Sequence, residues 1–405
     1  MPEITNEASS KAVAKLDPMK VTIVGGGHIG TALCCYIKHT YPEYEVRMFT
    51  RRPERFASLI TCNDWEGECS YQVELNCVSN DASLAAKDAD IVFIALPHFA
   101  VEKAFADIAP FVAEGSFVGV LPGSGGFEFF FDKYFKGKAK LFGFQRVPFT
   151  AKLAEYGKEV NLKSWKPCSV VGTLHAADLD EACARIEACG LKTKRADNFL
   201  AVSLTPSNPV LHTSRTYEIF GDKPRDYEFS EHLHFYVGWG NKASETLFAV
   251  DGELHALFDA MPELDMSSVK PLGEHYESPT IEAMTAKINS IQTFQTVMAP
   301  MKPAPAATSA PASAANASEG KFVADTSSRL FTEDFPWGLA IIRAYCEIFG
   351  TPAPTIDKVL GWYASYMGLE YYVDGKFCGK DLAKTGIPQN HGITTREQVI
   401  ELFSK

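Results

Sequence analysis

The sequence lacks the features that mark membrane, secreted and nucleic-acid-binding proteins. It has no uninterrupted apolar run of about 20 residues, the length that a helix needs to span a bilayer. Residues 1–19 are mostly polar and lack the apolar core of a signal peptide, so we expect a flexible tail there. The formal net charge of -11 is unfavourable for binding a phosphate backbone. We therefore expect a soluble protein with no nucleic acid and no membrane as partner.

The cysteines show neither CxxC pairs nor the density of a small disulfide scaffold, although the chain has 10 of them. Reduced thiols in a cytoplasmic protein fit this distribution best. The alternative is a metal site at Cys62, Cys69 and Cys77, but their spacings are long and no histidine lies near them in the sequence. We expect no metal.

The length of 405 residues suits two domains of about 200 residues each. Over residues 20–198, short apolar runs alternate with helical patterns, which predicts a doubly wound, largely parallel α/β domain of the Rossmann type. Residues 199–405 lose this alternation and predict a mainly α-helical second domain. Within it, residues 299–320 are rich in Pro, Ala and Ser, a composition typical of a mobile loop.

The helices of the second domain are predicted from apolar periodicity and end signals. The first is the best marked, because Asn208 suits the N-cap, Pro209 the first helical position and Gly221 the end. Further helices are expected at 227–262, 280–291, 334–349 and 356–368. An Asp-Gly pair within 371–377 predicts a tight hairpin.

A glycine motif, Gly25-x-Gly27-x-x-Gly30, lies between the first predicted strand and the first predicted helix. In this context it indicates a dinucleotide site: Gly25 permits the tight turn, Gly27 lets a pyrophosphate approach, and Gly30 lets the helix pack closely. The N-terminus of the helix then faces the anion. The alternative is a glycine-rich turn that holds no ligand.

Neighbouring residues extend this candidate site. His28 and Ile29 lie inside the motif, and Pro97 follows a later strand, where ligands of open α/β sheets bind. After the second strand the chain carries Arg51 and Arg52 in place of the acid typical of NAD enzymes, which favours NADP over NAD. The alternative is that both arginines are solvated loop charges.

The candidate chemical residues are His212, Arg329 and Asp334. His212 is expected in the first turn of a helix, where the positive end of the helix dipole favours a neutral imidazole that accepts a proton. A packed histidine after a helix cap explains the same residues, and Arg329 with its neighbouring acids is also typical of an ordinary charged helix start. The residues alone leave these alternatives open.

Two separate motifs, Asn208-Pro-x-x-His212 and Arg329 followed by Thr-Glu-Asp-x-Pro-x-Gly, resemble those of the octopine/opine dehydrogenases. The resemblance covers nearly the whole chain after the tail. It implies a reductive condensation of an amino acid with a 2-oxo acid by NAD(P)H, or the reverse oxidation of a CH–NH bond. It further implies that His212 exchanges a proton with substrate, that Asp334 orients its ring, and that Arg329 positions this pair or a substrate carboxylate. Asn208 would hydrogen-bond substrate or cofactor.

The sequence departs from the shellfish octopine enzymes near the expected oxo-acid position. Ser124 stands where those enzymes carry a glutamine, and the segment around Arg146 replaces a threonine. We hypothesise that Arg146 receives a carboxylate, which would permit a dicarboxylic oxo acid. A surface arginine, or one that contacts the cofactor phosphates, is the alternative.

Two other functions have the same architecture. One is a ketopantoate reductase-like or hydroxy-acid dehydrogenase, which would reduce a carbonyl without an amine. The other is an NADP-binding sensor without turnover, against which the intact His212, Arg329 and Asp334 argue. We expect a monomer or a homodimer.

Overall fold

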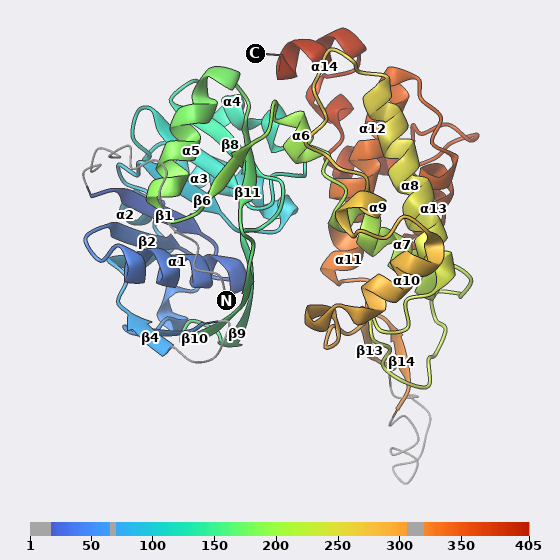
Figure 1. Ribbon diagram of the computed structural model, residues 1–405, viewed down its shortest axis with the longest axis horizontal. Helices are drawn as coiled ribbons and strands as arrows, with labels where there is room; N and C mark the ends of the chain where they lie inside the picture. Colours follow the sequence, from blue (N-terminus) through green and yellow to red (C-terminus); the bar gives the residue numbers. More distant parts are fainter. Residues whose placement is uncertain (1–17, 65–69, 306–319, 405) are drawn as a thin grey trace, which may run out of the picture.

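The computed structural model describes residues 18–64, 70–305 and 320–404. The N-terminal half of the chain forms an α/β unit and the C-terminal half a mostly helical unit beside it (Figure 1). The predicted N-terminal tail lies almost entirely outside the described residues, as does most of the predicted loop at 299–320. Within the described residues, no helix combines the length and the apolar character needed to cross a membrane.

The α/β unit contains an eight-stranded sheet of order β12-β11-β8-β7-β6-β1-β2-β5. Neighbouring strands are parallel except β8 and β11. Its strands are β1 (Lys20–Val24), β2 (Glu45–Phe49), β5 (Cys77–Ser79), β6 (Ile91–Ile94), β7 (Ser116–Val120), β8 (Ala139–Phe144), β11 (Ser169–Thr173) and β12 (Thr193–Arg195). The order on either side of β1 is that of a Rossmann sheet, which confirms the predicted fold.

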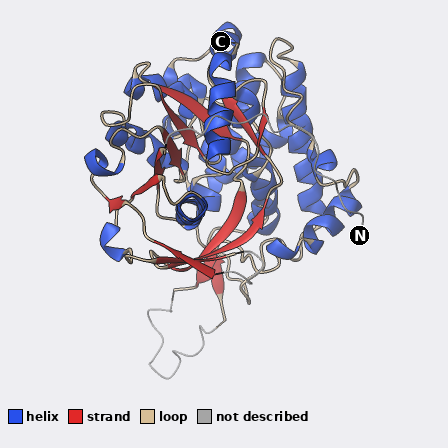
Figure 2. Cartoon of the chain, turned by 60° about the vertical axis from the view of Figure 1, so that its left-hand side comes forward, coloured by secondary structure: helices blue, strands red, loops and turns tan. Residues whose placement is uncertain are grey.

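Both faces of this sheet are covered, because successive side chains of its central strands enter different cores. Ile23 and Phe93 belong to one hydrophobic cluster, whereas Val24 and Ile94 belong to the other. Figure 2 shows helices beside the strands of the sheet. The helices of this unit are α1 (His28–Thr40), α2 (Ala82–Ala85), α3 (Val101–Ile108), α4 (Phe131–Phe135) and α5 (Leu179–Ala188).

A second, four-stranded sheet was not expected from the sequence. Its order is β4-β3-β10-β9, with the strands β3 (Ile60–Asn63), β4 (Ser70–Val73), β9 (Phe149–Glu155) and β10 (Glu159–Trp165). Leu153 of β9 donates its backbone N–H to Nδ1 of His28 at 3.0 Å. The second sheet therefore reaches the start of α1, where the glycine motif lies.

The helical unit begins with α6, and its buried residues continue one of the two cores of the α/β unit. Its helices are α6 (Leu200–Ser203), α7 (Asn208–Phe220), α8 (Asn241–Asp259), α9 (Leu272–His275), α10 (Ile281–Ser290), α11 (Arg329–Thr332), α12 (Ala340–Phe349), α13 (Pro354–Met367) and α14 (Arg396–Phe403). Short 3₁₀ turns lie at Pro53–Arg55, His98–Ala100, Phe127–Phe129, Ala176–Asp178, Gln292–Phe294, Lys380–Lys384 and Pro388–His391. The mainly helical second domain is confirmed.

The helix predicted at 227–262 is wrong over its first part. Only Asn241–Asp259 is helical, because Gly238 takes a positive φ of 80° and Gly240 is the N-cap of α8. The preceding segment is irregular and pairs at Phe229 with Phe322. This correction matters because the irregular segment carries a residue of the candidate site.

Three smaller predictions also need correction. The predicted loop at 299–320 begins with the strand β13 (Met301–Pro303), which pairs with β14 (Phe322–Ala324). Asn208 is the first helical residue of α7 and not its N-cap, which is Ser207 and makes no side-chain capping bond. The helix predicted from 334 starts as a π-helix at Phe335–Leu339.

Candidate active site

The glycine motif forms the turn between β1 and α1, and a side chain added at each of its glycines would have different surroundings. Gly25 has a φ of 111°, and a Cβ there would lie 2.6 Å from the Ala95 carbonyl oxygen. A Cβ on Gly30 would lie 1.9 Å from the Gly25 oxygen, whereas one on Gly27 would meet nothing within 4 Å. Open space above Gly27, at the N-terminus of α1, fits the approach of a dinucleotide pyrophosphate.

The remaining cofactor candidates surround this turn. His28 and Ile29 are the first residues of α1, and Pro97 lies half-buried after β6. Burial, followed by the charges of Arg329 and Lys152, lowers the pKa of His28. Arg329, from the helical unit, thus lies near the start of α1.

Arg51 and Arg52 follow β2, and both are exposed. Neither guanidinium makes a hydrogen bond or an ion pair within the part of the chain that the structure describes. They are therefore free to meet an anionic group of a ligand bound along the carboxyl edge of the sheet.

His212, Asp334 and Tyr236 come together in the helical unit. His212 Nδ1 lies 2.8 Å from Asp334 Oδ2, and His212 Nε2 lies 2.8 Å from the Tyr236 hydroxyl. The π-helical turn after Asp334 packs tightly on the start of α7, since a Cβ on Gly338 would lie 2.7 Å from Pro209 Cγ. This close packing fixes the separation of the histidine and the aspartate.

The tautomer of His212 follows from its two partners. Burial, followed by Tyr276 and Asp334, raises the pKa of Tyr236, so its phenol stays protonated at neutral pH. Tyr236 then donates to Nε2, while Nδ1–H donates to the Asp334 carboxylate. In this arrangement Nδ1 carries the proton and Nε2 is the hydrogen-bond acceptor of the ring.

Tyr236 is a site residue that the sequence analysis missed. It is 6% exposed, and its ring stacks on Phe294 with centroids 3.9 Å apart. The signal that could have found it is the pair Gly238 and Gly240, which interrupts the helical pattern just after the tyrosine.

Arg329 forms its ion pair with Glu333 and not with Asp334. Glu333 also lies 2.6 Å from His98 Nδ1 and accepts the His98 backbone N–H at 2.9 Å. Burial alone would raise the pKa of Glu333, but hydrogen bonds and charge from His98 and Arg329 hold it at about 2. This ionised carboxylate joins the end of β6 to the helical unit, and neither His98 nor Glu333 was singled out from the sequence.

The side chains of the two substrate candidates form no bond to this network among the described residues. Asn208 is exposed and its side chain makes no hydrogen bond within the described residues. Arg146 follows β8, is partly buried, and lies close enough to Tyr276 for their charges to interact. The structure therefore brings His212 and Asp334 into contact. Asn208 lies one helical turn before His212 in α7, and among the described residues neither its side chain nor that of Arg146 makes a hydrogen bond or an ion pair with either residue.

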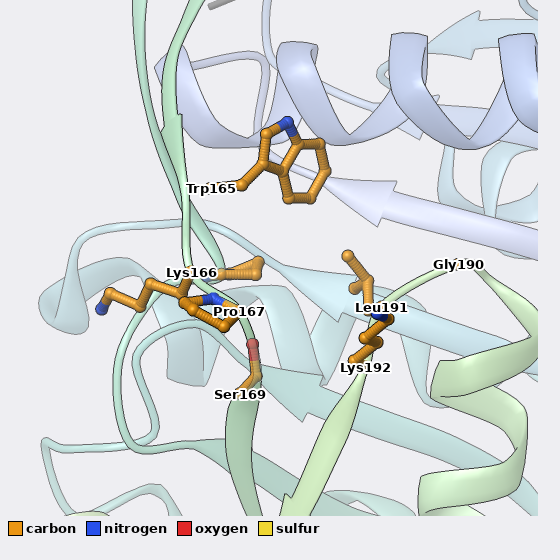
Figure 3. Close-up of a pocket in the computed structure, with 8 residues that line it drawn as sticks. Trp165, Lys166, Pro167, Ser169, Gly190, Leu191 and Lys192 are labelled. Atoms are coloured by element: carbon orange, nitrogen blue, oxygen red, sulfur yellow. The ribbon is translucent and has the colours of Figure 1, made fainter. Parts of the chain in front are cut away.

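A cavity of about 230 Å³ in the α/β unit does not contain the candidate site (Figure 3). It is lined by Pro148, Trp165, Lys166, Pro167, Ser169, Gly190, Leu191 and Lys192. In Figure 3 the side chain of Lys166 points away from Leu191. Among the described residues, no group of three or more His, Cys, Asp or Glu is placed to hold a metal ion.

Comparison with known proteins links both units to nicotinamide enzymes. Residues 195–367 match the family described as NAD/NADP octopine/nopaline dehydrogenase, alpha-helical domain, and residues 20–123 match the NAD-dependent glycerol-3-phosphate dehydrogenase N-terminus. A tauropine dehydrogenase of Arabella iricolor is 30% identical over 94% of this chain and 99% of its own. An opine dehydrogenase of Haliotis discus hannai is 28% identical over 95% of this chain and 98% of its own. A solved octopine dehydrogenase with NADH and L-arginine superposes with a TM-score of 0.76 at 23% identity, over 94% of this chain and 98% of its own.

Proposed function

The chain belongs to the octopine and opine dehydrogenase family, and from this premise we propose that it reductively condenses an amino acid with a 2-oxo acid. It is a nicotinamide-dependent dehydrogenase that acts on the CH–NH bond of the product in the reverse direction. The observation that carries this proposal is the Asp334–His212–Tyr236 chain of hydrogen bonds, which holds the imidazole ring between an aspartate and a phenol.

His212 is proposed as the catalytic acid and base. Condensation requires that the amine lose a proton and that the carbonyl oxygen leave as water, so one group must accept and return a proton. A substrate atom that replaces the Tyr236 hydroxyl at Nε2 would exchange its proton there. Asp334 would hold the ring orientation and stabilise the imidazolium that forms.

The glycine turn and the strand ends are proposed to hold the dinucleotide. Gly25, Gly27 and Gly30 would cradle its pyrophosphate at the N-terminus of α1, with His28 and Ile29 beside it. The bound reduced cofactor supplies the hydride that reduces the carbon–nitrogen double bond. Pro97, at the carboxyl end of β6, would border the nicotinamide.

NADP is proposed as the preferred cofactor. The free guanidiniums of Arg51 and Arg52 after β2, where an acid would repel a 2′-phosphate, support this preference. Arg329, placed between Glu333 and the start of α1, is proposed to position the helical unit against the cofactor turn. Asn208 stays a proposed substrate contact, which its exposure at the start of α7 permits.

A cytoplasmic location is also proposed. All cysteines of the described residues are free, which suits a reducing compartment. The domain boundary near residue 198 is a further proposal, supported by the bond from Asn198 Nδ2 to the Asp265 carbonyl at 2.7 Å, where the two units meet.

The test follows the oxidation of NADPH and NADH by absorbance. Pyruvate or 2-oxoglutarate is supplied with a panel of amino acids, each added or omitted. Oxidation that requires both an oxo acid and an amine supports the proposal and identifies the cofactor. Oxidation with the oxo acid alone would favour a hydroxy-acid or ketopantoate reductase-like enzyme, and tight nucleotide binding without turnover would favour a sensor.

A further inference from the structure

A second imidazole, that of His98, lies between the glycine turn and the helical unit. β1 and β6 are parallel neighbours, and a Cβ on Gly25 would lie 2.6 Å from the Ala95 carbonyl oxygen, so the chain that leaves β6 packs on the glycine turn. His98 follows Pro97, which is proposed to border the nicotinamide, and begins the short turn at the carboxyl end of this strand. Ligands of open α/β sheets bind at this edge. His98 is therefore placed beside the proposed position of the nicotinamide.

A carboxylate of the helical unit holds this imidazole. His98 Nδ1 lies 2.6 Å from Glu333 Oε1, and the His98 backbone N–H donates to the same oxygen at 2.9 Å. The Nδ1 contact is an ion-pair contact without the geometry of a linear hydrogen bond. Since Glu333 is ionised at neutral pH, it would repel a lone pair on Nδ1 at this distance, so Nδ1 carries a proton. Nε2 is the nitrogen that is left to face a ligand.

Two consecutive residues of the helical unit contact the two imidazoles. Glu333 faces His98 of the α/β unit, and Asp334 contacts His212 of α7. The Cα atoms of consecutive residues are about 3.8 Å apart, so both imidazoles are joined to the same short stretch of chain. The site therefore contains a second imidazole besides the proposed catalytic one.

The loop after β7 encloses the rest of the His98 ring. Ser124 Oγ lies 3.5 Å from His98 Nε2. Gly125 has a φ of 121°, and a Cβ there would lie 2.1 Å from His98 Cδ2, so glycine is what lets the loop approach the ring this closely. Phe127 stacks on the ring with centroids 5.5 Å apart and an interplanar angle of 10°. These contacts fix the direction in which Nε2 points.

His98 Nε2 and the Ser124 hydroxyl are free to bond a further atom. Their separation of 3.5 Å exceeds the range of about 2.7–3.2 Å that is typical of hydrogen bonds. Neither atom has another hydrogen-bond partner among the described residues. The His98 side chain is 11% exposed, so the ring is not sealed from a ligand. A ligand oxygen placed between the two groups can bond both.

The chemistry of these two groups selects the kind of oxygen that they bind. With Nδ1 protonated toward Glu333, Nε2 of the neutral ring is an acceptor. An ionised substrate carboxylate has no proton to give to it, whereas a hydroxyl has one. When an amine adds to a 2-oxo acid, the oxo oxygen becomes a hydroxyl before it leaves as water. Such a hydroxyl can donate to His98 Nε2 and accept from Ser124 at the same time.

From this placement we infer that His98 and Ser124 bind the oxygen of the reacting carbon, which enters as the oxo oxygen of the 2-oxo acid. Ser124 donates to this oxygen, and His98 Nε2 accepts from it once it is a hydroxyl. Both contacts form together only with the hydroxyl that arises on amine addition, so the pair favours this adduct over the oxo acid. The inference rests on the proposed opine-forming function and adds a second imidazole to its site.

The test measures the binding of two acids that differ by one hydroxyl group. Lactate carries a hydroxyl on the carbon next to its carboxylate, as the adduct does, and propionate lacks it. The protein is saturated with NADPH or NADH, so that lactate is not oxidised, and is titrated in a calorimeter with propionate and with each enantiomer of lactate.

Wild type is compared with two variants and a matched control. His98→Phe keeps an aromatic ring beside Phe127 and removes both nitrogens, and Ser124→Ala removes the hydroxyl. The control is His391→Phe, because His391 is exposed and stacks on Phe129 at 5.6 Å without contacting this site.

Wild type should bind one enantiomer of lactate about tenfold or more tightly than propionate. His98→Phe and Ser124→Ala should each reduce this preference about three- to tenfold and leave the affinity for propionate nearly unchanged, because propionate has no oxygen at this position. His391→Phe should behave as wild type. Three results would overturn the inference: a wild type without preference for lactate, variants that keep the full preference, and variants that lose affinity for both acids alike. The last is expected if His98 only joins the two units.

The failures of the two proposals are distinguishable, because the binding test requires no turnover. If the protein joins an oxo acid to an amine but the variants bind lactate as wild type does, the oxygen site is refuted while the opine-forming function stands. If lactate binding depends on His98 but no amine enters the product, the proposed function is refuted, and the site is that of a hydroxy-acid dehydrogenase.

Discussion

Glu128 provides a test of how the two units are joined. Its carboxyl is 4% exposed and accepts a hydrogen bond from Ser203 of α6 at 2.8 Å. Its second oxygen is buried without a partner among the described residues, and so is the hydroxyl of the nearby Tyr345. Burial raises the pKa of Glu128 from 4.5 to about 7.

The expected pH dependence follows from this raised pKa. The unfolded carboxyl loses its proton near pH 4.5, whereas the folded one keeps it up to about pH 7. The group therefore stabilises the fold fully below pH 4.5, and this contribution is lost as the pH rises to about 7. The pKa difference corresponds to a loss of about 3 kcal/mol.

The perturbation is Glu128→Gln, which keeps the acceptor for Ser203 and removes the titration. Unfolding by denaturant is measured for wild type and variant at intervals from pH 4.5 to 8, so that other titrating groups cancel in the difference. The stability of the variant relative to wild type should rise by about 3 kcal/mol across this range and then level off. A difference in unfolding free energy between variant and wild type that stays constant over this pH range would refute the reasoning.

Three further predictions concern the site. Asp334→Asn, which removes the charge that orients His212, should lower kcat up to about 10⁴-fold with an unchanged circular dichroism spectrum; a change below about tenfold contradicts its orienting role. Tyr236→Phe removes the hydroxyl that substrate must displace from Nε2, so kcat/KM should not fall in steady-state assays, whereas a loss of about tenfold would mean that the hydroxyl contributes to the reaction instead of being displaced. The double variant Arg51→Ala with Arg52→Ala should raise the KM for NADPH about tenfold or more and leave that for NADH nearly unchanged; equal effects on both cofactors would argue against a 2′-phosphate site.

The parts of the fold that the sequence predicted are those encoded locally. Gly25 and Gly30 stand where any side chain would collide with backbone, so their positions mark the turn whatever the rest of the chain does. The all-apolar β6 likewise identifies a strand covered on both faces. Such signals lie within a few residues of each other, which explains why sequence reasoning succeeded there.

The features that the sequence did not predict depend on contacts between distant segments. Tyr236, which contacts His212, lies in an irregular segment whose apolar residues fit a helical period and therefore predict a helix. His98 and Glu333 are 235 residues apart in the chain, and no local pattern pairs them. Arg329 was expected beside Asp334, but an acid one turn away, Glu333, competes for it.

The central claim is tested most directly by the mass of the product. Wild-type protein is incubated with NADPH or NADH, a 2-oxo acid and an isotopically labelled amino acid, and the mixture is analysed by mass spectrometry. The account predicts a secondary amine that contains both the labelled nitrogen and the carbon skeleton of the oxo acid. A 2-hydroxy acid formed beside unchanged amino acid would contradict it.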